Sequence, residues 1–148
     1  MNLSSEKVTE EVGDALAAAL RPGDVVTLSG PLGAGKSTLA RAVLHAAGHE
    51  GEVPSPTFAI VQPYDELPLP IWHCDLYRLE NPSELDELGL DEVLGEGVLL
   101  IEWPERALRT GAAAWPQALR LSLIVGADGQ RSLTWEVPAA WTGRWPPA

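Results

Sequence analysis

The sequence has a single cysteine, no long apolar run and no apolar leader at its N-terminus. The lone Cys74 excludes an internal disulfide framework and a zinc site built on cysteines. The longest apolar runs, Ala15–Leu20 and Val98–Ile101, are far shorter than the ~20 residues that span a bilayer. Residues 1–6 carry neither a basic start nor an apolar segment, so we expect a protein that is not secreted.

Basic residues are scarce as well. The 148 residues include 10 of lysine or arginine against 21 of aspartate or glutamate, which gives a formal charge of −11 and an isoelectric point near 4.5. Binding to bare nucleic acid needs a concentrated basic surface, and this balance argues against it. The length predicts one domain, 1–148, with an ordinary apolar share of 45%. These features indicate a small acidic domain, which we expect in the cytoplasm.

The hydrophobic pattern divides the chain into alternating helices and strands. The expected helices are 5–20, 37–47 and 83–88, and the expected strands are 25–28, 57–62, 71–76, 98–103, 119–125 and 133–137. The last two strands flank the turn signal Asp128-Gly129, which predicts an antiparallel hairpin. Residues 139–148 are rich in Trp, Pro and Gly, and we expect them to form a loosely packed tail.

One segment carries a specific chemical signature. Residues 30–37, GPLGAGKS, satisfy the pattern G-x-x-x-x-G-K-[S/T] at every fixed position, between an expected strand and an expected helix. Glycines let backbone N–H groups turn toward phosphate oxygens, and the positive end of the following helix points at the same place. Lys36 supplies a mobile charge for the phosphates, and the Ser37 hydroxyl can hold magnesium. The alternative is a glycine-rich turn with a chance lysine, and the flanking strand and helix favour nucleotide binding over it.

This segment also sets the expected fold. We predict a P-loop NTPase-like α/β fold, a three-layer sandwich with a mixed, mostly parallel sheet and a C-terminal antiparallel hairpin. The loop should be exposed, so that removing the Lys36 side chain costs phosphate contacts and little packing. The loop residues expected to contact nucleotide are Gly30, Leu32, Gly33, Ala34, Gly35, Lys36, Ser37 and Thr38.

Hydrolysis of a nucleotide also needs a carboxylate beside magnesium and a group that orients water. Two acids end apolar strands, Glu102 and Asp75; the pattern favours a functional role for Glu102 over a strand-end acid that faces solvent, and for Asp75 it favours neither. His73 by itself is typical of a packed core histidine, and Cys74 of a small buried filler. Ser55-Pro56-Thr57-Phe58 is a stiff turn that presents a hydroxyl, and taken alone it is only a turn.

Taken together, four motifs resemble the TsaE family, also called YjeE. They are GPLGAGKSTL at 30–39, SPTF at 55–58, HCDLYRL at 73–79 and IEWPE at 101–105. The resemblance runs from about residue 8 to residue 137, and the four motifs in this order are very specific. Two departures are mild: Ser37 stands where Thr is more usual, and Pro31 stands where the family often has Asp.

The resemblance implies an ATPase that uses magnesium in tRNA threonylcarbamoyladenosine synthesis. Such a protein acts with TsaB and TsaD, which modify the adenosine beside the anticodon in tRNAs reading codons that begin with A. It would regulate or reset the TsaD transferase, meeting tRNA only through the complex and no membrane.

The resemblance also implies roles for single residues. Ser37 and Glu102 would hold magnesium, and Asp75 would lie near the γ-phosphate or its water. Thr57 would sit on a switch-like loop, which makes Asp75, Glu102 and Thr57 the expected catalytic residues. Trp103 would cover the nucleotide, although core packing explains it equally well.

Several alternatives stay open. The acidic residues Glu84, Asp86, Glu87, Asp91, Glu92 and Glu96 form either a solvated helix face or a surface for a basic partner. Trp135, Trp141 and Trp145 are either anchors in the same contact or packing residues. Other functions compatible with a P-loop are a small-molecule kinase, with Arg106 and Arg109 as its lid, and a nucleotide-gated binding module with negligible turnover.

Overall fold

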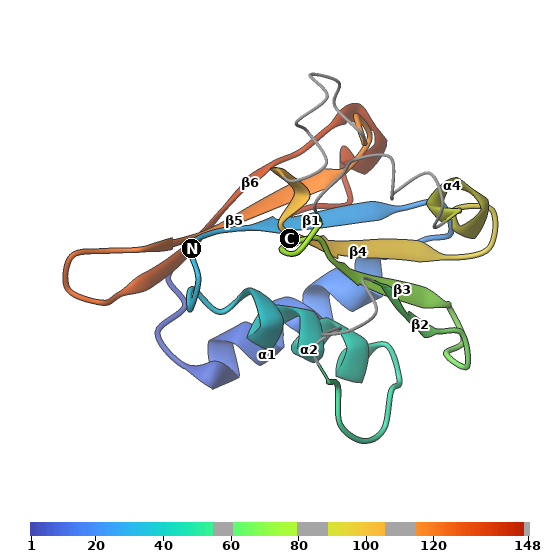
Figure 1. The fold of residues 1–148 in the computed structure, drawn as a ribbon. Helices are drawn as coiled ribbons and strands as arrows, with labels where there is room; N and C mark the ends of the chain where they lie inside the picture. The colour runs from blue at the N-terminus through green and yellow to red at the C-terminus, as the bar shows by residue number, and fades with distance from the viewer. Residues whose placement is uncertain (55–60, 80–88, 106–114, 147–148) are drawn as a thin grey trace.

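The computed structural model is built around one six-stranded sheet (Figure 1). It describes residues 1–54, 61–79, 89–105 and 115–146. The elements in chain order are α1 (Glu6–Ala19), β1 (Val25–Ser29), α2 (Lys36–Ala46), β2 (Val61–Tyr64), β3 (Ile71–Asp75), α4 (Leu90–Val93), β4 (Val98–Glu102), β5 (Leu119–Val125), β6 (Arg131–Glu136) and the 3-10 helix η2 (Ala139–Trp141). The predicted α/β class is confirmed. The expected helix over 83–88 and most of the expected strand over 57–62 lie outside the described residues.

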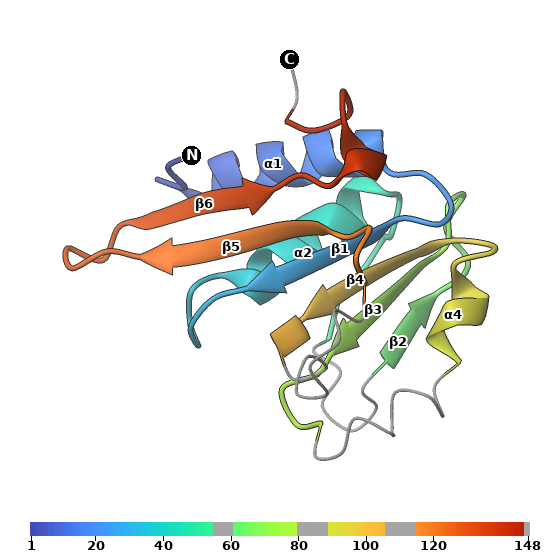
Figure 2. The same cartoon turned by 90° about the horizontal axis from the view of Figure 1, so that it is seen from above.

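The centre of the sheet is parallel and both of its edges are antiparallel. In the order β2-β3-β4-β1-β5-β6, β1 runs parallel to β4 and β5, and β3 runs parallel to β4. Strand β6 pairs antiparallel with β5, which confirms the predicted hairpin. The antiparallel pairing of β2 with β3 was not predicted. Because parallel strands end at the same edge of a sheet, the carboxyl ends of β1, β3 and β4 lie together (Figure 2).

Helices α1 and α2 cover the same face of the sheet (Figure 1). Ser5 caps α1 through its side-chain oxygen, and Val12 and Leu16 are buried on the inner side of this helix. Gly13 allows the two helices to approach closely, since a Cβ there would lie 2.7 Å from the Cβ of Ala42. No helix in the described part of the chain is both long enough and apolar enough to cross a membrane.

Strand β4 is buried on both of its faces. Val98 and Leu100 belong to the core beneath the two long helices, whereas Leu99 and Ile101 belong to a second cluster on the opposite face. That second cluster includes Cys74, and burial raises the pKa of its thiol to about 12. Cys74 is therefore the buried filler that was predicted. Apolar layers on both faces are what a sandwich with a central sheet requires.

The N-terminal residues lie along the outer edge of β6. Asn2 forms an antiparallel bridge with Ser132, and the Leu3 N–H donates to the Arg131 carbonyl at 2.9 Å. The start of the chain is thereby held beside the β5–β6 hairpin, where it forms one wall of a pocket.

The prediction of a loosely packed tail is wrong for residues 139–146. Trp141 is fully buried, and the ring of Trp145 packs edge-on against Trp135 with centroids 5.7 Å apart. Arg144 forms a partly buried ion pair with Asp24 and donates to the Ala19 carbonyl at 2.7 Å. Large aromatic rings have more apolar surface to bury than the Pro and Gly around them suggest. Trp141 and Trp145 are therefore packing residues and not partner anchors.

Candidate functional site

The loop at residues 30–35 joins β1 to α2 at the carboxyl edge of the sheet. A Cβ at Gly30 would lie 2.7 Å from the Leu123 carbonyl oxygen, so only glycine fits there. Gly35, with φ of 104°, caps α2 without a side-chain hydrogen bond. The N–H groups of the first turn of α2 therefore keep their capacity to bind an anion.

Within this loop the side chains differ greatly in exposure. Leu32 is 78% exposed at the tip, whereas Ala34 is buried against the core. The Gly33 carbonyl accepts a hydrogen bond of 3.1 Å from the guanidinium of Arg131, the first residue of β6. Nothing in the sequence indicates that Arg131 contacts this loop, because only the folded hairpin brings the two together.

The loop was expected to be exposed, and its tip is, but the side chain of Lys36 is buried. The residue is only 5% exposed, and its Nζ donates to the carbonyls of Gly30 at 2.5 Å and Pro31 at 2.9 Å. Nζ also lies 4.0 Å from the ring centroid of Trp103. Burial lowers the pKa of the Lys36 ammonium, while the charges of nearby carboxylates, Glu102 first, act to raise it. The lysine is thus folded back onto its own loop.

Ser37 and Glu102 meet across the sheet edge. The Ser37 Oγ donates to Glu102 Oε1 at 3.0 Å, and Glu102 Oε2 lies 2.6 Å from Nε2 of His73. Glu102 and His73 are each 2% exposed. The reading of Glu102 as a glutamate that faces solvent is therefore excluded. His73 is buried, as predicted, but its bond to Glu102 was not foreseen.

Asp75 stands beside Glu102 because the two residues are partners in the register of β3 and β4. Its Oδ1 accepts a hydrogen bond of 3.0 Å from the Tyr77 N–H. Burial, reinforced by the negative charge of Glu102, raises the pKa of the Asp75 carboxyl, against opposing effects from the Tyr77 N–H and from the nearby His73 and Lys36.

Trp103 follows β4 with a positive φ of 59°, an uncommon backbone conformation for a large side chain. Its ring lies over Lys36 and packs against Tyr77 with centroids 4.9 Å apart. The same residue contacts the second core cluster. The packing expectation for Trp103 is therefore confirmed, while its place over a nucleotide stays a prediction.

Several of these side chains line a pocket of about 330 Å³, which we name the phosphate pocket after the ligand expected there. Its walls include Lys36, Ser37, Asp75, Glu102 and Trp103. Of the predicted site residues, Gly30 and Ala34 do not line this pocket, and Thr57 lies outside the described residues; the others line it together. The lid candidates Arg106 and Arg109 and the acidic residues Glu84, Asp86 and Glu87 also lie outside them, while Glu92 and Glu96 are exposed.

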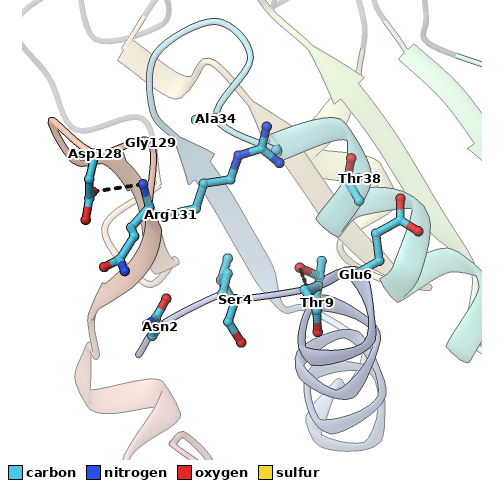
Figure 3. A pocket seen from close by; sticks show the side chains of 13 residues that line it. Asn2, Ser4, Glu6, Thr9, Ala34, Thr38, Asp128, Gly129 and Arg131 are labelled. Carbon is cyan, nitrogen blue, oxygen red and sulfur yellow. Dashed lines mark hydrogen bonds between the residues drawn. The ribbon is translucent and has the colours of Figure 1, made fainter.

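A second pocket, of about 430 Å³, shares part of its lining with the phosphate pocket, and Figure 3 shows this second pocket. It lies between the N-terminal segment around Ser4, the start of α2 and the β5–β6 hairpin. Gly35, Thr38 and Arg131 line both pockets. Figure 3 shows the Arg131 side chain extending from the hairpin toward the loop at Ala34. No sequence pattern predicts this pocket, because its walls come from three distant segments.

Comparisons with known proteins agree on one family. The family described as "Threonylcarbamoyl adenosine biosynthesis protein TsaE" matches residues 3–133. A protein of that description from Rickettsia bellii is 43% identical over 104 residues, which are 70% of this chain and 72% of that protein. The Bacillus subtilis protein is 46% identical over 96 residues, which are 64% of this chain and 60% of that protein. A crystal structure of YdiB from Bacillus subtilis superposes with a TM-score of 0.74 at 30% identity, covering 91% of this chain and 82% of that one.

Proposed function

This chain belongs to the TsaE family, which takes part in tRNA threonylcarbamoyladenosine biosynthesis, and we propose that it serves there as a magnesium-dependent ATPase. One observation carries the proposal. The Ser37 hydroxyl at the start of α2 and the Glu102 carboxylate at the end of β4 meet at 3.0 Å, beside the buried Lys36. A loop lysine, a hydroxyl and an acid from a neighbouring strand are the groups that P-loop enzymes use for phosphoryl transfer.

The donor atoms at this position suit magnesium. Hydroxyl and carboxylate oxygens are hard ligands, and Mg²⁺ usually takes one or two carboxylates together with substrate phosphates and water. Within the described ranges, no cluster of three or more His, Cys, Asp and Glu could hold a metal by itself, which suits an ion shared with a nucleotide. Ser37 and Glu102 would hold the ion, which when bound would neutralise charge on the phosphate oxygens.

Lys36 and Asp75 would have separate tasks. The Lys36 ammonium would leave the Gly30 and Pro31 carbonyls for the β and γ phosphates, whose charge favours its protonated form. Asp75 would orient the attacking water, and a carboxyl whose pKa is raised is a stronger base once ionised. Thr57 would report on the γ-phosphate from its switch-like loop.

The second pocket supports a place for the nucleoside of ATP. It continues from the phosphate pocket past Gly35 and Thr38, the side of the loop away from Glu102 and Asp75. Arg131, which lines both pockets, could contact the base or the phosphates. Trp103 would close the opposite side, over the phosphates.

We propose that the partners are TsaD and TsaB, in the cytoplasm, with tRNA reached only through their complex. ATP hydrolysis would regulate or reset the TsaD transferase. The strongly acidic charge of −11 is consistent with a protein that works beside tRNA without binding it directly.

The test combines turnover with assembly. The purified chain should release phosphate from ATP only when magnesium is present, and it should join the TsaB–TsaD pair when ATP is bound, as measured by the mass of the complex. A chain that binds no ATP would refute the assignment, and a small metabolite that strongly stimulates ATP consumption would point to a kinase.

A further inference from the structure

His73 and Glu102 form a buried pair beneath the phosphate pocket. Both side chains are 2% exposed, and Nε2 of His73 lies 2.6 Å from Oε2 of Glu102. The proposed metal role requires Glu102 as a carboxylate, which can only accept hydrogen bonds, and this assigns the hydrogen to the imidazole Nε2 as donor. His73 lies in β3 and Glu102 ends β4, so the bond crosses between two neighbouring parallel strands.

The two oxygens of Glu102 have different partners. Oε2 accepts from His73, whereas Oε1 accepts from the Ser37 hydroxyl at 3.0 Å. Glutamate has one more rotatable bond than aspartate, so a glutamate in this position has more conformations to lose before it can act as a ligand. The bond from His73 fixes Oε2 and thereby leaves Oε1 directed at Ser37.

No other polar contact of the His73 side chain is found among the described residues. Its Nδ1 is buried and has no hydrogen-bond partner there. A buried polar atom without a partner costs free energy, so an apolar side chain would satisfy the packing at this position at least as well. The bond to Glu102 is therefore the feature of the folded chain that explains a histidine here.

We propose that His73 is a positioning residue, which orients Glu102 toward Ser37 and so sets the affinity for the divalent cation in the nucleotide complex. This inference rests on the proposed function, because it needs Ser37 and Glu102 to share the ion. Removing a partner that orients a metal ligand typically costs ~10–100-fold in metal affinity or activity.

The experiment measures Mn²⁺ binding to the ADP complex by electron paramagnetic resonance, which does not depend on turnover. H73A should weaken Mn²⁺ binding by ~10–100-fold. H73Q should restore most of the affinity, because the glutamine amide can donate to Glu102 from nearly the same place as Nε2. H73L fills the space without a donor and should resemble H73A, which keeps the test valid if the alanine variant does not fold.

Cys74→Ala is the matched control, since it changes the next residue of the same strand without touching Glu102. It should leave Mn²⁺ binding unchanged, and ADP binding in EDTA should be the same in all the variants. If H73L binds Mn²⁺ as tightly as the wild type, or if H73Q is as weak as H73L, the positioning role is wrong while the proposed function stands. If the wild-type ADP complex itself binds no Mn²⁺, the proposed function fails and this inference fails with it.

Discussion

Replacing Glu102 with glutamine separates the charge of this side chain from its contacts. In E102Q the amide oxygen can accept the hydrogen of His73 Nε2, now bonded at 2.6 Å, and the amide NH2 can donate to the Ser37 oxygen, now at 3.0 Å. Only the hydrogen bond with Ser37 exchanges its donor and acceptor. We therefore expect the melting temperature of E102Q to stay close to that of the wild type.

The lost charge should act on turnover instead. Glu102 exerts the largest of the carboxylate effects that raise the pKa of Lys36, and it also raises the pKa of Asp75. Both pKa values should fall in E102Q, which makes Asp75 a weaker base, and a neutral amide is a weaker ligand for magnesium. We expect magnesium-dependent ATP hydrolysis to fall at least ~10-fold, a loss of about 1.4 kcal/mol of transition-state stabilisation.

The assay is phosphate release at saturating ATP over a magnesium titration, with ATP binding in EDTA and thermal denaturation measured on the same samples. Glu96→Gln removes the same charge from an exposed position and is the control. Turnover of E102Q equal to that of the wild type, at every magnesium concentration, would show that Glu102 does not serve the ion. Asp75 would then be the remaining carboxylate candidate.

Four further substitutions test the site, the partners and the fold. Lys36→Ala should abolish ATP binding, because it removes the ammonium expected to contact the phosphates. The protein should stay folded, because burial already disfavours the charged ammonium of Lys36. Near-normal affinity in a titration with labelled ATP would contradict the P-loop assignment. In size-exclusion runs with TsaB and TsaD, a non-hydrolysable ATP analogue should promote the complex much more than ADP does. Thr57→Ala should blunt that difference, and equal complex formation with both nucleotides would rule out gating by hydrolysis. Trp141→Ala should lower the free energy of unfolding by ~3–5 kcal/mol in a urea titration, and a change below about 1 kcal/mol would contradict the burial of this ring. Gly13→Ala should destabilise the protein by ~1–3 kcal/mol despite the higher helix propensity of alanine, because its Cβ would clash with Ala42; increased stability would show that the helices can separate.

The features that could be predicted from the sequence are those determined by residues close together in the chain. The segment from Gly30 to Ser37 could be recognised from the sequence, because each fixed position is required either by the backbone conformation of the loop or by contact with a phosphate. The acid at Glu102 could be found because it ends an apolar strand. The hairpin at Asp128-Gly129 was predicted correctly for the same reason, since two residues determine the turn.

The features that could not be predicted from the sequence depend on contacts between distant segments of the chain. Nothing near His73 in the chain indicates that its ring meets Glu102, 29 residues later. The antiparallel pairing of β2 with β3 and the second pocket beside Arg131 likewise arise only after the sheet has formed. The burial of Lys36 depends on the ring of Trp103 and on the loop's own carbonyls, and the composition of the C-terminal segment concealed how much surface Trp141 buries.

The contact between Arg144 and Asp24 also bears on when the chain can fold during its synthesis. The two residues are 120 positions apart, so the ribosome completes α1, β1 and the whole phosphate loop long before Arg144 exists. Until then the Ala19 carbonyl lacks its guanidinium donor, and the site that Trp141 fills in the core stays open to water. Because domains generally fold as cooperative units, we expect a nascent chain halted before residue 141 to be sensitive to protease even though its phosphate loop is fully synthesised. We therefore expect the nucleotide site to become stable only when a segment that lines neither of the two pockets has left the ribosome.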